Sequence, residues 1–284
     1  WIFLVASKPE DGGGHMMRSI ALARTMLDYN DIHFVLDQKG EYWLSRLEDK
    51  GFTVEFFNER DDFKLTLRDD NDCLGIFVDD YNVTNKNLLK WKQRYGKLAV
   101  IADFEDTPEF VDFVISPSLA KSALDYKHQI NMNGPTFAML SPEYSNNINI
   151  NECDEINTIL LSFGFFDSKN CTESTLNILN KIGFHGVVKI AIGSQAIHLS
   201  NIKKKLSNYI FKTEVFENTD GLYELNLNVD FVIGAGGVSL LERMALGKSS
   251  VTVVTAYNQL KQSQWAENIG ATLLVDASKE NFQE

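Results

Sequence analysis

Short apolar runs alternate along the chain with longer segments in which apolar residues recur at helical spacing. Residues 2–6 form the first apolar run, a glycine-rich turn follows, and apolar residues from about 15 to 29 fall on one broad face. The pattern predicts strands at residues 2–6, 32–36, 52–57, 75–78, 97–102 and 111–115, and helices at 15–29, 42–50 and 85–94. Strands that alternate with helices are joined by right-handed crossovers and form a parallel sheet.

A polar, asparagine-rich stretch, SNNININECDEIN at residues 145–157, interrupts this alternation and has the composition of a linker. The alternation then restarts, with predicted strands at 158–163, 187–192, 213–216, 230–233 and 250–254 and helices at 172–182, 239–245 and 262–268. Each half has enough strands for its own sheet. We therefore predict two doubly wound α/β domains, residues 1–145 and 158–284, joined by a linker at 146–157. One large α/β domain with a long excursion is the alternative.

The acidic balance of the chain limits its partners. Lys and Arg number 27 against 39 Asp and Glu, so the formal net charge is −12. Nucleic-acid phosphates bind basic surfaces, and we therefore expect no nucleic-acid partner. No apolar run approaches the roughly 18–20 residues of a membrane-spanning helix, so we expect no integral membrane segment.

The cysteines and histidines indicate neither disulfides nor a metal site. Cys73, Cys153 and Cys171 are odd in number and widely spaced, which suits a reducing cytoplasm better than a disulfide framework. The five histidines are scattered, and no Cys/His spacing fits zinc. We expect a cytoplasmic protein that uses no metal and no cofactor.

The glycine-rich segment DGGGHMMRS, residues 11–19, lies between the first predicted strand and the first predicted helix. Its glycines, among them Gly13 and Gly14, allow a tight turn, and free N–H groups at a helix start favour anions. His15 follows at the carboxyl edge of the strand, where ligands of open α/β sheets bind. A neutral imidazole is suited there to removing a proton from water. A histidine satisfied by the nearby backbone is an equally open interpretation.

Polar clusters also follow two later predicted strands. The residues after the strand at 75–78 are Asp79, Asp80, Tyr81 and Asn82, and those after residue 101 include Asp103, Glu105 and Asp106. Carboxylates at strand ends orient a histidine, hold sugar hydroxyls or cap a helix. For any single residue, capping is the simpler interpretation.

The second half contains a comparable glycine turn. The segment VIGAGGVSLLERMALGKSS, residues 232–250, leads from a predicted strand through Gly236 and Gly237 into a helix. A glycine turn at a helix N-terminus is suited to bind a diphosphate, and Glu242 in the second turn is suited to accept from ribose hydroxyls. The alternatives are a tightly packed turn and a solvated surface acid. Gly164 lies in another glycine turn, residues 162–167, after the first strand of this half.

Four segments of the chain resemble one family of nucleotide-sugar hydrolases. They are GGGHMMRSIALA (12–23), GPTFAMLSPEY (134–144), GAGGVSLLERMALG (234–247) and NQLKQSQWAENIGA (258–271). The family comprises the UDP-2,4-diacetamido-2,4,6-trideoxy-β-L-altropyranose hydrolases of pseudaminic acid biosynthesis, with relatives similar to spore coat polysaccharide protein G. The similarity spans nearly the whole chain. It implies a GT-B architecture, in which two Rossmann-like domains with doubly wound parallel sheets face a cleft.

The resemblance also implies roles for individual residues. His15 stands at the place of the family's catalytic histidine, and Asp79 and Tyr81 match its D-x-Y element. Asn258 begins its N-Q element and would face the sugar. The remaining contacts to nucleotide or substrate are expected from the glycine turns and the residues that follow them, namely Gly13, Gly14, Gly164, Asn170, Gly236, Gly237, Ser239, Glu242 and Gln259.

Three elements depart from the family pattern. The family's S-F-G-G-S-D element has Phe165 and Phe166 in place of a glycine and a small polar residue, and its L-L-R-P-E element has Ser141 in place of arginine. The acidic D-D-L-A-D-R-P stretch, residues 102–108 here, lacks its first aspartate. The two phenylalanines would narrow the pocket floor or displace a phosphate-facing loop. These departures bear on the substrate more than on the reaction class.

The implied function is hydrolysis of a UDP-linked 2,4-diacetamido-2,4,6-trideoxyhexose at its anomeric C1–O bond, releasing UDP and free sugar. His15 would be the general base for water, and Asp79, Tyr81 and Asn258 would position the sugar and the water. The UDP-sugar is the expected partner, together with other enzymes of nonulosonic acid biosynthesis. An inverting GT-B glycosyltransferase and a non-catalytic nucleotide-sugar-binding domain are the alternatives.

Overall fold

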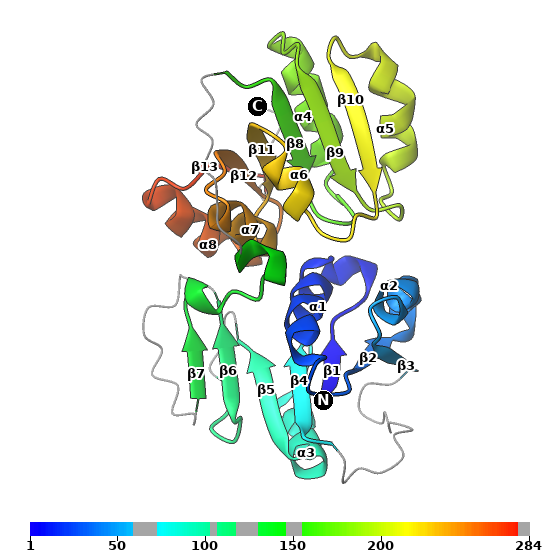
Figure 1. Ribbon diagram of the computed structural model, residues 1–284, viewed down its shortest axis with the longest axis vertical. Helices are drawn as coiled ribbons and strands as arrows, with labels where there is room; N and C mark the ends of the chain where they lie inside the picture. Colours follow the sequence, from blue (N-terminus) through cyan, green and yellow to red (C-terminus); the bar gives the residue numbers. More distant parts are fainter. Residues whose placement is uncertain (59–72, 103–106, 118–129, 146–154, 278–284) are drawn as a thin grey trace. The chain divides into compact units, whose positions relative to one another are not determined.

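The computed structural model describes residues 1–58, 73–102, 107–117, 130–145 and 155–277 (Figure 1). The chain divides into two compact units, Trp1–Ser141 and Pro142–Glu284. Most of the predicted linker, residues 146–154, lies outside the described residues. Each unit contains its own parallel sheet.

The first unit contains a seven-stranded sheet in the order β3-β2-β1-β4-β5-β6-β7, in which all neighbouring strands are parallel. Its strands are β1 (Ile2–Val5), β2 (His33–Asp37), β3 (Thr53–Phe57), β4 (Gly75–Asp79), β5 (Lys97–Ile101), β6 (Phe113–Ser116) and β7 (Ile130–Asn133). Its described helices are η1 (Pro9–Asp11), α1 (Gly14–Met26), η2 (Gln38–Trp43), α2 (Leu44–Glu48), α3 (Asn85–Tyr95) and η5 (Pro135–Phe137).

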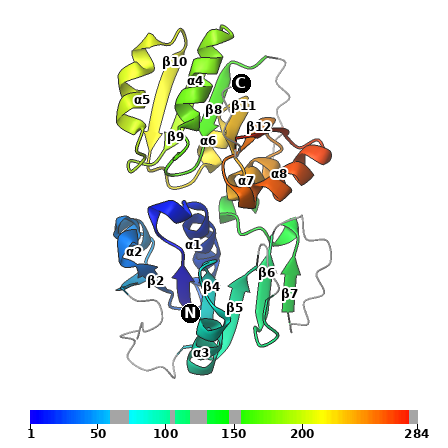
Figure 2. The ribbon, with the colours of Figure 1, turned by 180° about the vertical axis from the view of Figure 1, so that it is seen from behind.

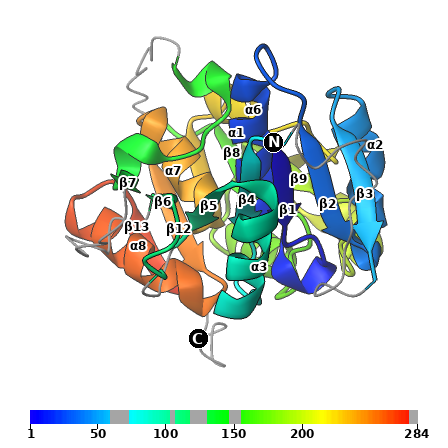
Figure 3. The ribbon, with the colours of Figure 1, turned by 90° about the horizontal axis from the view of Figure 1, so that it is seen from below.

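The helices of the first unit cover both faces of its sheet, because α1 and α3 lie on opposite sides (Figure 3). Successive residues of a strand point to opposite faces. Ile2 and Leu4 accordingly belong to the buried cluster that includes residues of α3, such as Trp91. Phe3, between them, contacts the rings of Phe34 and Phe77. Strand β1 is therefore buried on both faces, which explains its unbroken apolar sequence.

The second unit contains a six-stranded parallel sheet in the order β10-β9-β8-β11-β12-β13 (Figure 2). Its strands are β8 (Thr158–Ser162), β9 (Val187–Ile192), β10 (Lys212–Glu217), β11 (Phe231–Ala235), β12 (Ser250–Val254) and β13 (Leu273–Asp276). Its described helices are η6 (Pro142–Ser145), α4 (Cys171–Lys181), α5 (Leu199–Lys205), η7 (Leu206–Asn208), α6 (Tyr223–Leu227), α7 (Val238–Ala245) and α8 (Tyr257–Asn268).

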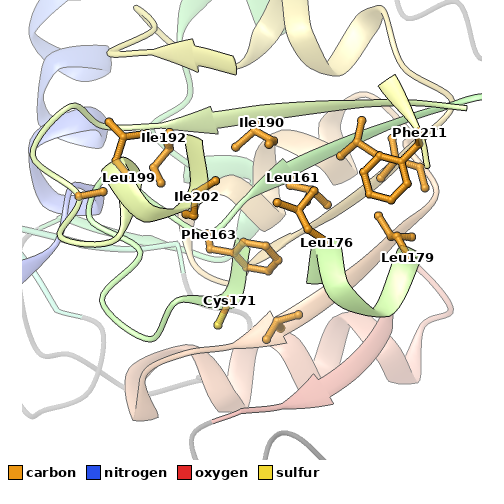
Figure 4. Packing of buried hydrophobic residues seen from close by; sticks show 14 of the residues in the cluster. Leu161, Phe163, Cys171, Leu176, Leu179, Ile190, Ile192, Leu199, Ile202 and Phe211 are labelled. Atoms are coloured by element: carbon orange, nitrogen blue, oxygen red, sulfur yellow. The ribbon is translucent and has the colours of Figure 1, made fainter. Parts of the chain in front are cut away.

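The larger of two described buried clusters in the second unit lies between its sheet and the helices α4 and α5. Leu161 of β8 and Ile190 of β9 belong to the same cluster as Leu176 of α4 and Ile202 of α5 (Figure 4). All four side chains are essentially inaccessible to solvent. Burying side chains of this size contributes roughly 1.5–3 kcal/mol each. This apolar contact fixes the two helices on their sheet.

In each unit the first strand of the chain, β1 or β8, lies inside the sheet, and the strand order reverses at that strand. Strand β1 pairs with both β2 and β4, and β8 pairs with both β9 and β11. Ligands of open α/β sheets bind outside the carboxyl ends of the strands at such a reversal. The predicted doubly wound parallel sheets are therefore confirmed, and candidate sites belong at the ends of β1 and β4 and of β8 and β11.

The sequence pattern missed β7, β13, α5 and α6, and it joined η2 and α2 into one helix. Strand β7 has the sequence INMN and is half-buried to exposed, so it lacks the apolar run that marks a strand. Strand β13 is also at a sheet edge and exposes Leu273. Short edge elements have few neighbours, and their sequences are correspondingly less constrained.

Within the described ranges, none of the helices combines the length and the apolar character that crossing a membrane requires.

Candidate functional site

Strand β4 delivers a buried carboxylate to the carboxyl edge of the first sheet. Asp79 is its last residue, pairs in register with Val5 of β1 and has no exposed surface. The strand that carries it is apolar from Ile76 to Val78, so the fold buries this aspartate together with its strand. An isolated buried carboxylate is strongly unfavourable, so Asp79 requires partners.

Helix α1 supplies the histidine partner of Asp79. His15 is the second residue of α1, and its Nδ1 lies 2.6 Å from Oδ1 of Asp79. The ring of Tyr81 stands edge-on to the imidazole at a centroid distance of 4.6 Å. The structure thus brings together the three residues of this unit to which the family resemblance assigns catalytic roles. With Nδ1 donating its proton to Asp79, the lone pair of the ring lies on Nε2.

Two further residues of α1, not anticipated from the sequence, also bind Asp79. Arg18 donates from Nε to Oδ2 at 2.6 Å and from Nη2 to Oδ1 at 2.5 Å, which is a bidentate pair. Ser19 donates its hydroxyl to Oδ2 at 3.2 Å. Arg18 and Ser19 lie three and four residues after His15, so helical spacing places all three on one face. That spacing is the signal in the sequence that would have found them.

These donors decide the charge of Asp79. Burial by itself raises the pKa of this carboxyl, but Arg18 and His15 outweigh it and hold the pKa of Asp79 well below its usual range. The carboxylate is therefore ionised at neutral pH. An ionised aspartate that accepts from Nδ1 fixes the tautomer and the orientation of the imidazole.

The other polar candidates of this unit either make a local turn contact or lie outside the described residues. Asp80 accepts from the backbone N–H of Asn82 at 2.9 Å, which is the local turn-forming contact expected of such residues. Gly13 and Gly14 lie at the start of α1, which has no side-chain cap. The remaining acidic candidates, Asp103, Glu105 and Asp106, lie outside the described residues.

The glycine turn of the second unit leads from β11 into α7. Gly237 is the N-cap residue of α7, with φ of +75° and no side-chain cap on the helix. A Cβ on Gly236 would come within 2.8 Å of Oγ of Ser263 and 2.9 Å of Cβ of Gln259. Gly236 therefore permits the close approach of α8. Close packing and an open helix start coexist at this turn, at neighbouring residues.

Glu242 is buried in the second turn of α7, so the interpretation as a solvated surface acid is wrong. Burial raises the pKa of Glu242 from 4.5 to about 7, although the adjacent Arg243 favours its charged form. Arg243 is held by the carbonyl of Ala235 and by Oγ1 of Thr252, each at 3.0 Å. Glu242 is therefore a buried acid whose protonation changes near neutral pH.

Unpartnered polar atoms accompany Glu242. The hydroxyl of Tyr144 and both amide atoms of Asn226 are buried and reach no hydrogen-bond partner among the described residues. The ring of Tyr144 packs edge-on against Tyr223 at 5.1 Å. Buried polar atoms normally pair with protein, water or a ligand. Tyr144 and Asn226 therefore have unused hydrogen-bonding capacity close to Glu242.

A side chain of the protein binds the N–H groups at the start of α4, which follows the glycine turn after β8. Asp167 accepts from the N–H groups of Cys171 and Thr172 at 2.8 and 3.0 Å, so it occupies the start of α4. Asn170 adopts a left-handed conformation with φ of 55° and donates to Glu173. Gly164, with φ of +86°, has open space where a Cβ would lie. An anion cannot use the N–H groups that Asp167 already binds.

The structure has room for Phe165, the residue after Gly164 that departs from the family pattern. The backbone and ring of Phe165 lie against Gly193, where a Cβ would come within 2.6 Å of the ring. Phe166 packs edge-on to Phe165 at 5.3 Å. The bulky side chains that replace a glycine and a small residue are thus accommodated by a glycine at the end of β9.

Helix α8 carries the last predicted site residues. Asn258 is exposed at its first turn, and Gln259 accepts through Oε1 from the N–H and the hydroxyl of Thr255 at 3.0 and 3.1 Å. Gln259 therefore stabilises the entry into the helix. Ser239, the second residue of α7, is half-buried.

Several solved structures match the fold of nearly the whole chain, and glycosyltransferases are among them. MurG of Acinetobacter baumannii aligns over 99% of this chain and 87% of its own, with 12% identity and a TM-score of 0.65. The spinosyn rhamnosyltransferase SpnG, solved with thymidine diphosphate, covers the same shares with 12% identity and a TM-score of 0.60. Anabaena Alr3699/HepE, solved with UDP and glucose, covers 100% and 86% with 17% identity and a TM-score of 0.54.

These likenesses confirm the GT-B fold that was expected from the sequence. No protein-family model and no curated protein matches the chain. Identities this low establish a shared fold and leave the reaction to be argued from the residues themselves.

Replacing Gly236 tests the packing role of the α7 turn. Gly236→Ala should lower the free energy of unfolding by about 1–3 kcal/mol, because the methyl group would overlap α8. Gly14→Ala is the matched control, since no atom lies within 4 Å of its Cβ, and it should leave stability unchanged or raise it by up to about 1 kcal/mol. Urea unfolding of both variants measures the difference. Equal stabilities would contradict the packing argument.

Glu242 should make stability depend on pH. Its pKa is about 7 in the folded chain and near 4.5 when unfolded, so the folded state binds more protons between these values and stability falls as pH rises through them. Between pH 5 and pH 8 the wild type should lose about 2 kcal/mol more than Glu242→Gln. Denaturant unfolding at both pH values measures this loss. Parallel pH profiles for the two proteins would contradict it.

Proposed function

We propose that this chain is a nucleotide-sugar hydrolase acting on a UDP-linked 2,4-diacetamido-2,4,6-trideoxyhexose. The observation that carries the proposal is the buried pair of His15 and Asp79, whose 2.6 Å contact leaves Nε2 of the imidazole as a base. The GT-B fold supports a nucleotide-sugar substrate, since SpnG and HepE of the same fold were solved with thymidine diphosphate and with UDP and glucose. The identity of the sugar is inferred from the hydrolase family that the sequence resembles.

In this mechanism Nε2 of His15 accepts a proton from water while the water oxygen attacks C1 of the sugar. The C1–O bond breaks, its electron pair stays on the β-phosphate oxygen, and UDP leaves. Attack on the face opposite the leaving group inverts the anomeric centre. Asp79 stabilises the imidazolium that forms, and Tyr81 and Asn258 position the sugar and the water. The product is a free sugar for nonulosonic acid synthesis in the cytoplasm.

The second unit would hold the UDP portion. The start of α7 after Gly237 has N–H groups without a side-chain cap, and a helix N-terminus stabilises the negative charge that grows on the leaving phosphate. Glu242 would accept from the ribose hydroxyls. Gly164, Asn170, Ser239 and Gln259 are the further proposed nucleotide contacts of this unit, as Gly13 and Gly14 are substrate contacts of the first.

The second candidate is an inverting glycosyltransferase, favoured by the activities of CalG4, a calicheamicin glycosyltransferase, and the rhamnosyltransferase SpnG, which share the fold. The reaction would be the same, with an acceptor hydroxyl in place of water. Incubation with the UDP-sugar alone separates the two, because a hydrolase releases UDP and free sugar in equal amounts without an acceptor. Binding of UDP by calorimetry with no turnover of any donor would instead indicate a nucleotide-sugar-binding domain.

Removing the imidazole tests the general base. His15→Ala should lower kcat by at least about 10²-fold, because the water would lose its proton acceptor. The dissociation constant for UDP should change little, since the nucleotide is assigned to the other unit. Release of UDP from the UDP-sugar and calorimetry with UDP measure the two quantities. Turnover equal to wild type would overturn the role of His15.

The raised pKa of Glu242 predicts how UDP binding depends on pH. The ionised carboxylate is the better acceptor for ribose hydroxyls, so UDP should bind about 3- to 10-fold more tightly at pH 8 than at pH 6. The analogue 2′,3′-dideoxy-UDP has the same titrating phosphate but lacks both ribose hydroxyls. Its affinity should therefore lack the part of the pH dependence that comes from Glu242. Calorimetry with the two nucleotides makes the comparison. The same pH dependence for both would contradict ribose binding by Glu242.

A further inference from the structure

The guanidinium of Arg18 lies beside the pair formed by His15 and Asp79 and contacts both side chains. Its Nη2 lies 2.5 Å from Oδ1 of Asp79 and 3.2 Å from Nδ1 of His15. His15 Nδ1 lies 2.6 Å from the same Oδ1. Arg18 is itself buried, with 7% of its surface exposed. Two nitrogen donors therefore converge on one carboxylate oxygen.

This convergence fixes the hydrogen on the imidazole. An arginine nitrogen has hydrogens to donate and no lone pair to accept with. The ionised carboxylate of Asp79 can only accept, so its 2.6 Å contact places the hydrogen on Nδ1 and directs it to Oδ1, and Nη2 of Arg18 offers that hydrogen no acceptor. Arg18 also donates to the hydroxyl of Tyr81 at 3.3 Å, which ties the guanidinium to the ring that packs against His15.

The charges around His15 oppose one another. Asp79 places a negative charge 2.6 Å from Nδ1 of the imidazole, and the carboxylate of Asp11 in η1 also interacts electrostatically with His15. Arg18 disfavours a protonated imidazole, because protonation would place a second cation 3.2 Å from a guanidinium that stays charged. Tyr81 contributes an uncharged ring and hydroxyl. The ion pair of Asp79 and Arg18 has no net charge. Arg18 therefore offsets the attraction that the carboxylate would otherwise exert on a proton.

We propose that Arg18 is a positioning residue for the hydrolysis, which pairs with Asp79 so that His15 is held as the neutral Nδ1–H tautomer with Nε2 ready to accept the proton of water. The inference rests on the proposed role of His15 as general base. The proton that Nε2 accepts is released to solvent after each turnover. The same repulsion that keeps the imidazole neutral before the reaction favours that release.

The test compares two substitutions of Arg18 in the full chain. Arg18→Met removes the charge and keeps most of the side-chain length, whereas Arg18→Lys keeps the charge and loses the fork. The acid limb of the kcat/KM profile should move to higher pH by about one unit in Arg18→Met and stay within a few tenths of a unit in Arg18→Lys. The dissociation constant for UDP should be unchanged in both. An unmoved limb in Arg18→Met would overturn the proposal.

A second measurement reads the imidazole directly. ¹⁵N NMR of labelled protein should show His15 as the Nδ1–H tautomer at pH 8 in the wild type, and its protonation midpoint should rise by about one pH unit in Arg18→Met. Wild-type chemical shifts of a Nε2–H tautomer, or an unchanged midpoint, would overturn the proposal. This readout does not require turnover. If His15→Ala retained full activity, the proposed function would fail while the NMR result still decided the role of Arg18.

Removal of Arg18 alone leaves Asp79 buried with fewer donors and can prevent folding. The double variant Arg18→Met, Asp79→Asn removes both charges and keeps the interior neutral. In this variant His15 loses both the attraction of Asp79 and the repulsion of Arg18, so its protonation midpoint should be close to that of the wild type. A midpoint in the double variant equal to that of the wild type supports mutual cancellation of Arg18 and Asp79. A midpoint at least one unit above the wild type would refute it.

Discussion

The burial of one carboxylate organises the first unit of this protein. Asp79 ends a strand that is apolar on both faces, so the aspartate is withdrawn from water together with its strand. Its charge is tolerated because α1 presents Arg18, His15 and Ser19 to its two oxygens. Breaking such a buried set by removing one partner typically costs about 3–5 kcal/mol. The position of the imidazole therefore depends on the same contacts that keep the strand end folded.

The two helix starts of the second unit differ in a way that bears on ligand binding. Helix α4 begins on the carboxylate of Asp167, which binds two of its N–H groups. Helix α7 begins at Gly237 with no side-chain cap. Both helices follow glycine turns after central strands, so the two sequence patterns look alike. They differ in whether an acidic side chain binds the free N–H groups at the helix start. The phosphate site is therefore proposed at α7.

The two units combine different kinds of ionisable group. Asp79 has its pKa held far down by neighbouring donors, whereas burial raises the pKa of Glu242 to about 7. The first is a fixed anion suited to orienting a base. The second changes its protonation near neutral pH and has the unpartnered Tyr144 and Asn226 close by. Environment, rather than residue type, gives these two acids their different chemical capacities.

The alternation of apolar runs and helical periods determined the parallel sheets, because buried strands and amphipathic helices each impose their own spacing. The glycine turns and strand ends also nominated His15, Asp79 and Tyr81 in advance. The tertiary structure alone decided that Arg18 and Ser19 join them, that Glu242 is buried, and that Asp167 closes the start of α4. These facts depend on which side chains meet across β4 and α1 or around α7. The helical spacing of His15, Arg18 and Ser19 is visible in the sequence, but the sequence does not show that this face of α1 meets Asp79, about 60 residues away. For the short edge strands β7 and β13 even the local pattern is weak.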